Sequence, residues 1–356
     1  MDSAVAALDS ARRHTLGLVL RVRPLRAVFV APRLRVPAAA LVGLAVSVVM
    51  ALRAPLVALW LGAAIFGVPH VVAGVRHVAV KRSVTRTTRA LVAIAAAVGA
   101  AQIFAPGALA AEWAPRAFVV LFGAAVIVEI FAARAPAMRA APMLAATLVA
   151  VLIGLTRPTH ALLVLAHVHA LSSIAYAAIL ARRRGVSLTP VVVIAAVVTI
   201  AGAIGALDAL MPATLAAPRS AAASIAAEAT GASLDGLGAI GFRRALFLYA
   251  FGQSLHFAMW LRVVPEVDRP SPTPWSWRRA LVALRVDFGR LTVPLIIVCV
   301  LSVPVILIGG GAARESYFAL TYFHFGLEAA ALASLALRPA GAMASAAPVR
   351  SIAPAA

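Results

Sequence analysis

Eight histidine and glutamate side chains lie inside long apolar stretches, where an ionisable group is unexpected. They are His70, His77, Glu129, His167, His169, His256, His324 and Glu328. An ionisable side chain at mid-bilayer costs at least about 2.5–3.5 kcal/mol, so each one is a candidate functional residue. Neutral imidazole is the commonest metal ligand and suits iron, zinc or copper, while the single cysteine argues against a thiolate site. The set therefore predicts a histidine-lined metal centre.

Helical spacing places further polar side chains beside these histidines, because residues three, four and seven apart share one stripe of an α-helix. Three such stripes are His70, Gly74 and His77; Tyr249, Gln253, His256 and Trp260; and Tyr317, Thr321, His324 and Glu328. The expected metal ligands are His70, His167, His169, His256 and His324. The residues expected to orient them or to relay protons are His77, Glu129, Gln253, Tyr317 and Glu328.

His167 and His169 compete for the inward position on their helix. Their separation of two residues puts the side chains about 200° apart, so both cannot face one centre without distortion. Ser172, Ser173 and Tyr176 share the face of His169, which makes that side the more polar one. We therefore expect His169 to point inward, with His167 bonded to an adjacent helix or acting as a second ligand.

The elements that must position these residues are membrane-spanning helices. Of the 356 residues, 63% are hydrophobic and 12% charged, and the mean hydropathy is +1.00. Since about 20 apolar residues cross one bilayer, the sequence predicts an all-α fold, a polytopic membrane helix bundle of about ten transmembrane helices. The expected spans are 34–52, 55–80, 90–108, 116–136, 139–156, 158–181, 189–212, 241–263, 291–310 and 315–337.

The basic residues indicate how the chain is oriented. The net charge of +20 comes from 32 Lys and Arg against 12 acidic residues, and with ten spans 25 of the 32 fall on the side of the N-terminus. The positive-inside rule then places both termini in the cytoplasm. The charge is thus a topology signal, and we expect no nucleic-acid partner. We expect an integral protein of the bacterial inner membrane.

We divide the chain into three parts. Residues 1–33 form a basic cytoplasmic or interfacial segment, residues 34–337 the transmembrane domain, and residues 338–356 a flexible tail. Two long loops, 213–240 and 264–290, lie within the transmembrane domain. The second loop carries two tryptophans among arginines, which is typical of a segment at the membrane interface.

The eight ionisable residues all lie on even-numbered spans, which run from outside to inside in this topology. Counted from the outer ends, His70, Glu129, His169, His256 and His324 lie 9 to 15 residues into their spans. At 1.5 Å per residue, these depths agree to within about 10 Å. A common depth predicts that the histidines meet at one centre in the middle of the membrane.

The segment Gly67-Val68-Pro69-His70 resembles the Brp/Blh family of integral-membrane β-carotene 15,15'-dioxygenases, whose element is Gly-x-Pro-His-Gly-Ala-x-Asp. After His70 the chain departs from that element, and Gly74 stands where the family has its carboxylate. The resemblance implies iron held by intramembrane histidines, with His70 as a ligand and His169, His256 and His324 as its companions. It also implies O₂ and an apolar carotenoid dissolved in membrane lipid as substrates, with retinal as product.

Other functions use the same residue types. A haem held between histidines on facing helices would make the chain a membrane oxidoreductase. A proton-coupled transporter would use Glu129, Glu328 and the histidines as a relay, and a non-catalytic membrane scaffold would use them for packing. Desaturases and hydroxylases of lipid tails also have histidine-rich membrane sites. Their HxxxH and HxxHH boxes are absent from this sequence. Its single histidines on separate helices favour an arrangement like that of the Brp/Blh family over that of a desaturase.

Overall fold

The structure, a computed structural model, describes residues 2–80, 83–104, 108–211, 238–268 and 274–339. Helices are the only regular secondary structure in these ranges. The expected loop 213–240 and the expected tail 338–356 lie, apart from their edges, outside the described residues. The described chain is therefore all-α, as the hydropathy pattern predicts.

The helices of the first half include two π-helical segments on the second predicted span. In chain order they are α1 (Asp2–Leu20), α2 (Arg23–Val30), α3 (Pro32–Arg53), α4 (Pro55–Leu61), η1 (Gly62–Gly67), α5 (Val68–Val75), η2 (Arg76–Val80), α6 (Arg86–Phe104), α7 (Ala108–Ala132) and α8 (Ala137–Thr156). Pro32 and Pro55 open α3 and α4, where a missing N–H leaves no helical bond unmade.

The described residues of the second half are also mainly helical. Its helices are α9 (Pro158–Arg183), α10 (Thr189–Ile204), η3 (Asp208–Leu210), α12 (Gly238–Ala258), η6 (Met259–Val263), α13 (Val264–Asp268), α14 (Trp277–Phe288), η7 (Gly289–Leu291), α15 (Thr292–Ile308), α16 (Gly310–Thr321) and α17 (Phe323–Leu337). Gly205 ends α10 in the left-handed conformation, with φ of 87°, which a glycine adopts without strain.

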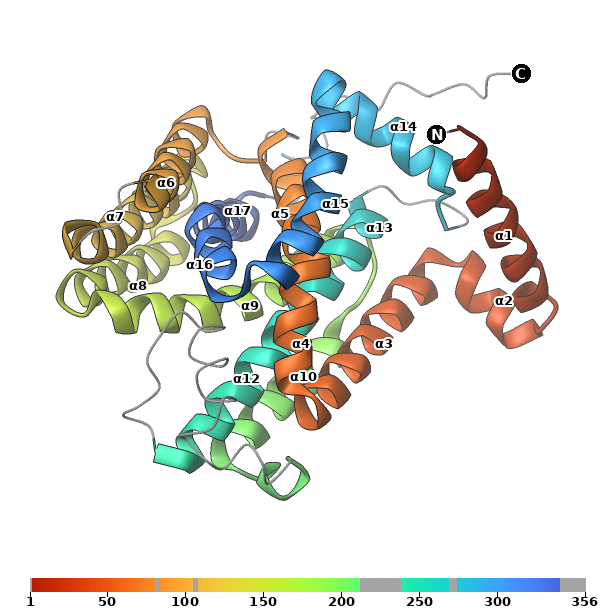
Figure 1. Cartoon of the computed structure of the whole chain (residues 1–356), viewed down its shortest axis with the longest axis horizontal. Helices are drawn as coiled ribbons and strands as arrows, with labels where there is room; N and C mark the ends of the chain where they lie inside the picture. The colour runs from red at the N-terminus through yellow and green to blue at the C-terminus, as the bar shows by residue number, and fades with distance from the viewer. Residues whose placement is uncertain (1, 81–82, 105–107, 212–237, 269–273, 340–356) are drawn as a thin grey trace.

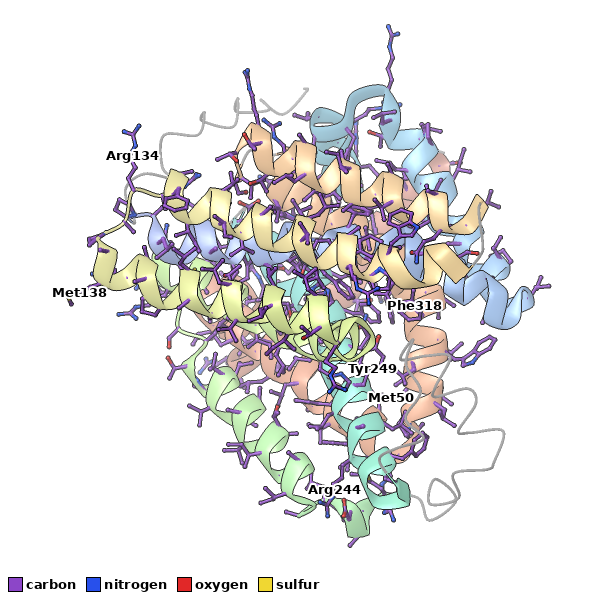
Figure 2. The ribbon with its side chains drawn as sticks, turned by 90° about the vertical axis from the view of Figure 1, so that its left-hand side faces the viewer. Met50, Arg134, Met138, Arg244, Tyr249 and Phe318 are labelled. Carbon is purple, nitrogen blue, oxygen red and sulfur yellow. The ribbon has the colours of Figure 1, made fainter. Side chains whose placement is uncertain are left out.

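Six helices among the described residues are long and apolar enough to cross a membrane. They are Pro32–Arg53, Pro55–Val80, Trp113–Ala132, Ala137–Thr156, Trp277–Ile308 and Ser316–Leu337. On α8 and α15 most side chains are exposed, including Leu152 and Val300, and Figure 2 shows Met138 projecting outward where α8 begins. Apolar surface of this extent belongs against lipid, so the chain is an integral membrane protein.

All ten predicted spans are helical over most of their length, whereas the count of ten crossings and the cytoplasmic termini stay predictions. The last predicted span, 315–337, is interrupted at Tyr322 between α16 and α17. Within the expected loop 264–290, the described residues include the short helix α13 and the helix α14. The first difference matters for the site, because the interruption lies on the helix of His324. The second places Asp268, at the end of α13, beside His77.

The most buried helix, α17, lies between α5 and the group formed by α6 and α7 (Figure 1). It also packs against α9, which in turn packs against α12. Trp260 and Phe251 are fully buried beside His256 in the sequence, and both belong to the main apolar core. The four helices α5, α9, α12 and α17 thereby surround one buried point of the bundle.

Candidate metal centre

Four histidines, each from a different helix, meet at this buried point. They are His70 on α5, His169 on α9, His256 on α12 and His324 on α17. Each offers one ring nitrogen, and these four nitrogens all lie within 4.8 Å of one another. No ring is more than 3% exposed. The structure thus gathers four imidazoles where the bundle excludes water.

The ring of His70 is held by the carbonyl of Phe66, one turn earlier. Its Nδ1 lies 3.0 Å from that oxygen. A carbonyl oxygen can only accept, so Nδ1 carries the proton and the Nε2 of a neutral ring presents a lone pair. The π-helical segment η1 ends at Gly67, and Pro69 cannot donate a backbone bond. The carbonyl that accepts from His70 thus lies in this π-helical segment, and π-helical segments are frequent at functional sites.

The ring of His324 is held in the same way by the carbonyl of Thr321. In a continuous helix this oxygen would accept from the backbone N–H of Phe325, but that N–H donates instead to Tyr322, at 3.0 Å. The break between α16 and α17 therefore frees the Thr321 oxygen, which accepts from Nδ1 of His324. Nε2 of His324 again presents a lone pair.

These two lone pairs face each other across the centre. Nε2 of His70 lies 3.2 Å from Nε2 of His324. Two neutral rings in these tautomers have no proton to share, so their contact is favourable only with a cation between them. Two nitrogens bound at 2.0–2.1 Å to one ion at an angle near 100° would be separated by about 3.2 Å. The spacing fits a shared metal ion.

His169 and His256 complete the group without hydrogen bonds of their own. Their ring centroids are 4.4 Å apart, and the ring of His169 stacks on Phe325 with centroids 3.9 Å apart. Phe257 covers His70 at 4.7 Å. Among the described residues, no nitrogen of His169 or His256 has a hydrogen-bond partner. Unpaired buried nitrogens of this kind are candidate metal ligands.

Among the described residues, the carboxylate of Glu328 adjoins two of the four rings, those of His169 and His256. Its Oε2 lies 3.5 Å from Nδ1 of His169, and its Oε1 lies 3.9 Å from Nε2 of His256. Both oxygens are buried, and neither has a hydrogen-bond partner within the described ranges. A Cβ built on Gly74 would approach Oε1 to 3.2 Å, so the glycine leaves room for this side chain. Glu328 can neutralise part of the charge of a bound cation.

The remaining predicted ligand, His167, lies outside the group. Its ring contacts Tyr249, with centroids 5.2 Å apart, whereas His169 two residues later belongs to the group of four. Gln253 is half-buried, one turn before His256 on α12. The buried ring of Tyr317 packs against Gly67, where a Cβ would come within 2.7 Å of its hydroxyl.

His77 lies two turns after His70, on η2, and pairs with an acid that the sequence pattern did not identify. Its Nδ1 lies 2.9 Å from Oδ2 of Asp268, at the end of α13. Ser83 donates a hydrogen bond to the backbone oxygen of His77. His77 therefore links η2 to α13, and is not one of the four grouped rings.

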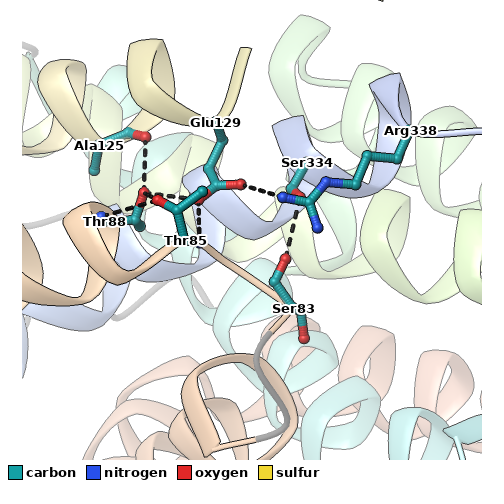
Figure 3. A network of polar contacts seen from close by, with 7 residues as sticks. All are labelled: Ser83, Thr85, Thr88, Ala125, Glu129, Ser334 and Arg338. Atoms are coloured by element: carbon teal, nitrogen blue, oxygen red, sulfur yellow. Dashed lines mark hydrogen bonds and ion pairs between the residues drawn. The ribbon is translucent and has the colours of Figure 1, made fainter. Parts of the chain in front are cut away.

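Glu129, predicted at the same depth as the histidines, belongs to a separate polar network (Figure 3). Its carboxylate accepts hydrogen bonds from the backbone N–H of Thr85 at 2.6 Å and from the hydroxyl of Thr88 at 2.8 Å. Arg338, beyond the end of α17, pairs with it at 3.1 Å. Ser334 bonds to the backbone of Ser83 nearby. Glu129 thus joins α7 to the start of α6 and to the end of α17.

Phe66, Phe257 and Phe325 are neighbours of the four rings that sequence patterns did not identify, and so is Asp268, the partner of His77. Thr321 was part of the polar stripe on its span, but it acts, like Phe66, through a backbone oxygen, which carries no sequence signal. Pro69, directly before His70, was the one available sign that this helix is irregular. Phe257 and Phe325 each follow a grouped histidine directly and could have been read as its neighbours.

Chemically, the group offers four neutral nitrogen ligands, one carboxylate and an apolar surrounding. Imidazole sites of this kind suit iron, zinc, copper or nickel. No protein-family model, curated protein or solved structure matches the chain. What the structure establishes is therefore a polytopic helical membrane protein with a buried group of four histidines that could hold a metal ion.

Proposed function

We propose that the four histidines hold one transition-metal ion, and that the chain is a metal-dependent oxygenase acting on an apolar substrate dissolved in the membrane. The observation that carries the metal is the 3.2 Å approach of two Nε2 atoms, those of His70 and His324, whose protons are both committed to backbone carbonyls. A cation held between the two nitrogens would make this buried contact favourable.

The identities of the metal as iron and of the substrate as a carotenoid rest on the resemblance at Gly67–His70. Non-haem iron, when bound by protein ligands, supplies the activation of O₂ for such a reaction. The predicted product of central cleavage is retinal. After His70 the chain lacks the carboxylate of the family element, because Gly74 stands at that position. Glu328 supports the proposal, since one of its oxygens lies beside Gly74.

The protein's own contribution would be to fix the ligands and keep water out. Phe66 and Thr321 orient two rings through their carbonyls, while Phe257 and Phe325 cover the group with apolar surface. Glu328 places one negative charge beside the rings. A preorganised, dry site strengthens each electrostatic interaction within it.

The position inside the bundle suits a substrate that dissolves in lipid. A polyene could enter sideways between helices and meet the centre without crossing water. In this proposal ten helices cross the bacterial inner membrane with both termini in the cytoplasm, and membrane lipid, an apolar small molecule and O₂ are the partners. The apolar outer faces of α8 and α15 support this placement.

Metal analysis of purified protein tests the proposal. We expect about one metal ion per chain in the wild type and much less in His70→Ala, His256→Ala and His324→Ala. His167→Ala is the matched control, because it removes an intramembrane histidine outside the group and should leave the metal content unchanged. If the three variants fold and keep the metal content of the wild type, the site lies elsewhere or does not exist.

An absorption spectrum of the same samples separates a bare ion from a haem. Each of the four rings contacts at least two of the others, and two phenylalanines cover them, with centroid distances from 3.9 to 6.3 Å, which leaves no room for a porphyrin between the described rings. We therefore expect no Soret band. A Soret band that disappears in His70→Ala or His324→Ala would replace the oxygenase proposal with a haem-binding oxidoreductase.

A further inference from the structure

Two short helices, α2 and α14, each lead directly into a long apolar helix. α2 ends at Val30 and α3 begins at Pro32, while the single turn η7 joins α14 to α15. Figure 1 shows α1, α2 and α14 together at the side of the molecule where α3 and α15 begin, and α1 packs against both of the other two helices. Because α3 and α15 enter the membrane from this side, α2 and α14 lie at its surface.

The outward face of α14 has an apolar middle and basic edges. Val282 and Val286, one turn apart, are 37% and 67% exposed and form the middle of this face. By helical spacing, the exposed arginines Arg278 and Arg285 lie on one side of them and the exposed Arg279 on the other. An arginine beside an apolar stripe can lie along it and extend its guanidinium to the phosphates, so this pattern fits a helix lying in the membrane interface.

α2 repeats this pattern over its eight residues. Its exposed Val30 lies between Arg23 and Arg26 on one face, and both arginines are exposed. At the start of α14, the indole of Trp277 is 54% exposed. Tryptophan is enriched at the depth of the lipid headgroups, so it supports the same placement for α14.

Among the described residues of α2 and α14, no carboxylate lies on these exposed faces. α2 contains no acid, and the single acid of α14, Asp287, pairs with Arg76 of η2 at 2.6 Å. Asp9 of α1 is buried and accepts hydrogen bonds from the backbone N–H groups of Trp277 and Arg278, at 2.7 and 3.1 Å. The two carboxylates therefore hold α14 from its inner side, and its outer face stays positively charged.

From this arrangement we infer that the outward faces of α2 and α14 bind the headgroups of anionic phospholipids. The arginines would contact the phosphates, and Val282, Val286 and Trp277 would lie just below them. Charge complementarity selects an anionic lipid over a zwitterionic one, because the exposed faces carry arginines and no acid. This binding does not depend on a metal ion at the four histidines.

Quenching by spin-labelled lipids tests this inference. A fluorophore is attached to Val286→Cys in a Cys299→Ser background, which removes the single native cysteine. The full chain is placed in nanodiscs of phosphatidylcholine and phosphatidylglycerol in equal amounts. We expect doxyl-labelled phosphatidylglycerol to quench the fluorophore several times more strongly than doxyl-labelled phosphatidylcholine at the same content. Since each arginine near an anionic surface strengthens binding about fivefold, Arg278→Gln/Arg285→Gln should remove most of this preference.

The matched control is Arg53→Gln/Arg157→Gln, which removes two exposed arginines at the end of α3 and just before α9 and should keep the preference. Salt at about 1 M, where charges are screened beyond about 3 Å, should weaken the preference of the parent protein. Equal quenching by the two lipids in the parent, or a preference that Arg278→Gln/Arg285→Gln retains, overturns the inference. Quenching by aqueous acrylamide and by neither lipid also overturns it, because α14 would then face water.

Discussion

Replacing Glu328 by glutamine tests the electrostatics of the centre directly, because it removes a charge and preserves the shape. The two carboxylate oxygens lie 3.5 and 3.9 Å from imidazole nitrogens, so an ion held by those nitrogens would be about 5 Å from the charge. At an effective dielectric constant near 20, unit charges at that distance interact by about 3 kcal/mol. A divalent ion doubles this energy.

Part of this energy is lost to desolvation, so we expect Glu328→Gln to weaken metal binding by at least about 100-fold, or about 2.7 kcal/mol. Stability without metal should behave differently. Neither oxygen of Glu328 has a hydrogen-bond partner within the described ranges, so a neutral amide removes an uncompensated buried acid. Metal-free Glu328→Gln should therefore unfold at the same temperature as the metal-free wild type, or at a higher one.

The matched control is Glu129→Gln, which changes the other buried glutamate. Its carboxylate accepts from Thr85 and Thr88 and pairs with Arg338, so its loss should destabilise the protein by about 2 kcal/mol and leave metal affinity unchanged. Competition against a chelator of known affinity measures binding, and thermal unfolding with and without chelator measures stability. If Glu328→Gln binds metal like the wild type, or is destabilised like Glu129→Gln, our assignment of this carboxylate is wrong.

Two further substitutions test the packing that supports the site. Gly67→Val should destabilise the protein by about 1–3 kcal/mol, because the new side chain meets the hydroxyl of Tyr317; thermal unfolding measures this, and an unchanged transition would contradict the close packing of Tyr317 on Gly67. Arg35→Ala should lower stability by about 1–2 kcal/mol, since Arg35 pairs with the buried Glu266 at 2.6 Å while Arg262, at 2.7 Å, still pairs with that glutamate; an unchanged transition in the same assay would show that the Arg35 pair is dispensable.

Sequence patterns predicted the helices and the grouping of the ligands for identifiable reasons. Runs of about 20 apolar residues marked the helices, and ionisable residues stood out against them. The even-numbered spans brought His70, His169, His256 and His324 to one depth. The polar face of the sixth span separated His169 from His167, and the structure places only His169 in the group.

The sequence pattern predicts the depth of a residue in the membrane but not its position around the bundle, and this explains what the patterns did not predict. Glu129 shares the predicted depth of the histidines, but the order of helices around the bundle places it against α6 and Arg338. A single sequence does not specify that order. Nor does it specify the break at Tyr322, because the apolar pattern continues through it, and this break is what frees the Thr321 carbonyl for His324.

The carboxylate beside the rings comes from α17 and not from the helix of His70. The resemblance at His70 lacks its acid at position 74, one turn further along the same helix. In the structure an acid nevertheless occupies the space beside that position, since Glu328 of α17 reaches Gly74 and two of the histidines. A Cβ at position 74 would approach Oε1 of Glu328 to 3.2 Å, so a larger side chain there would have to displace the glutamate, and glycine leaves it in place. The space beside Gly74 is thus what lets a carboxylate from α17 lie beside rings held by α9 and α12.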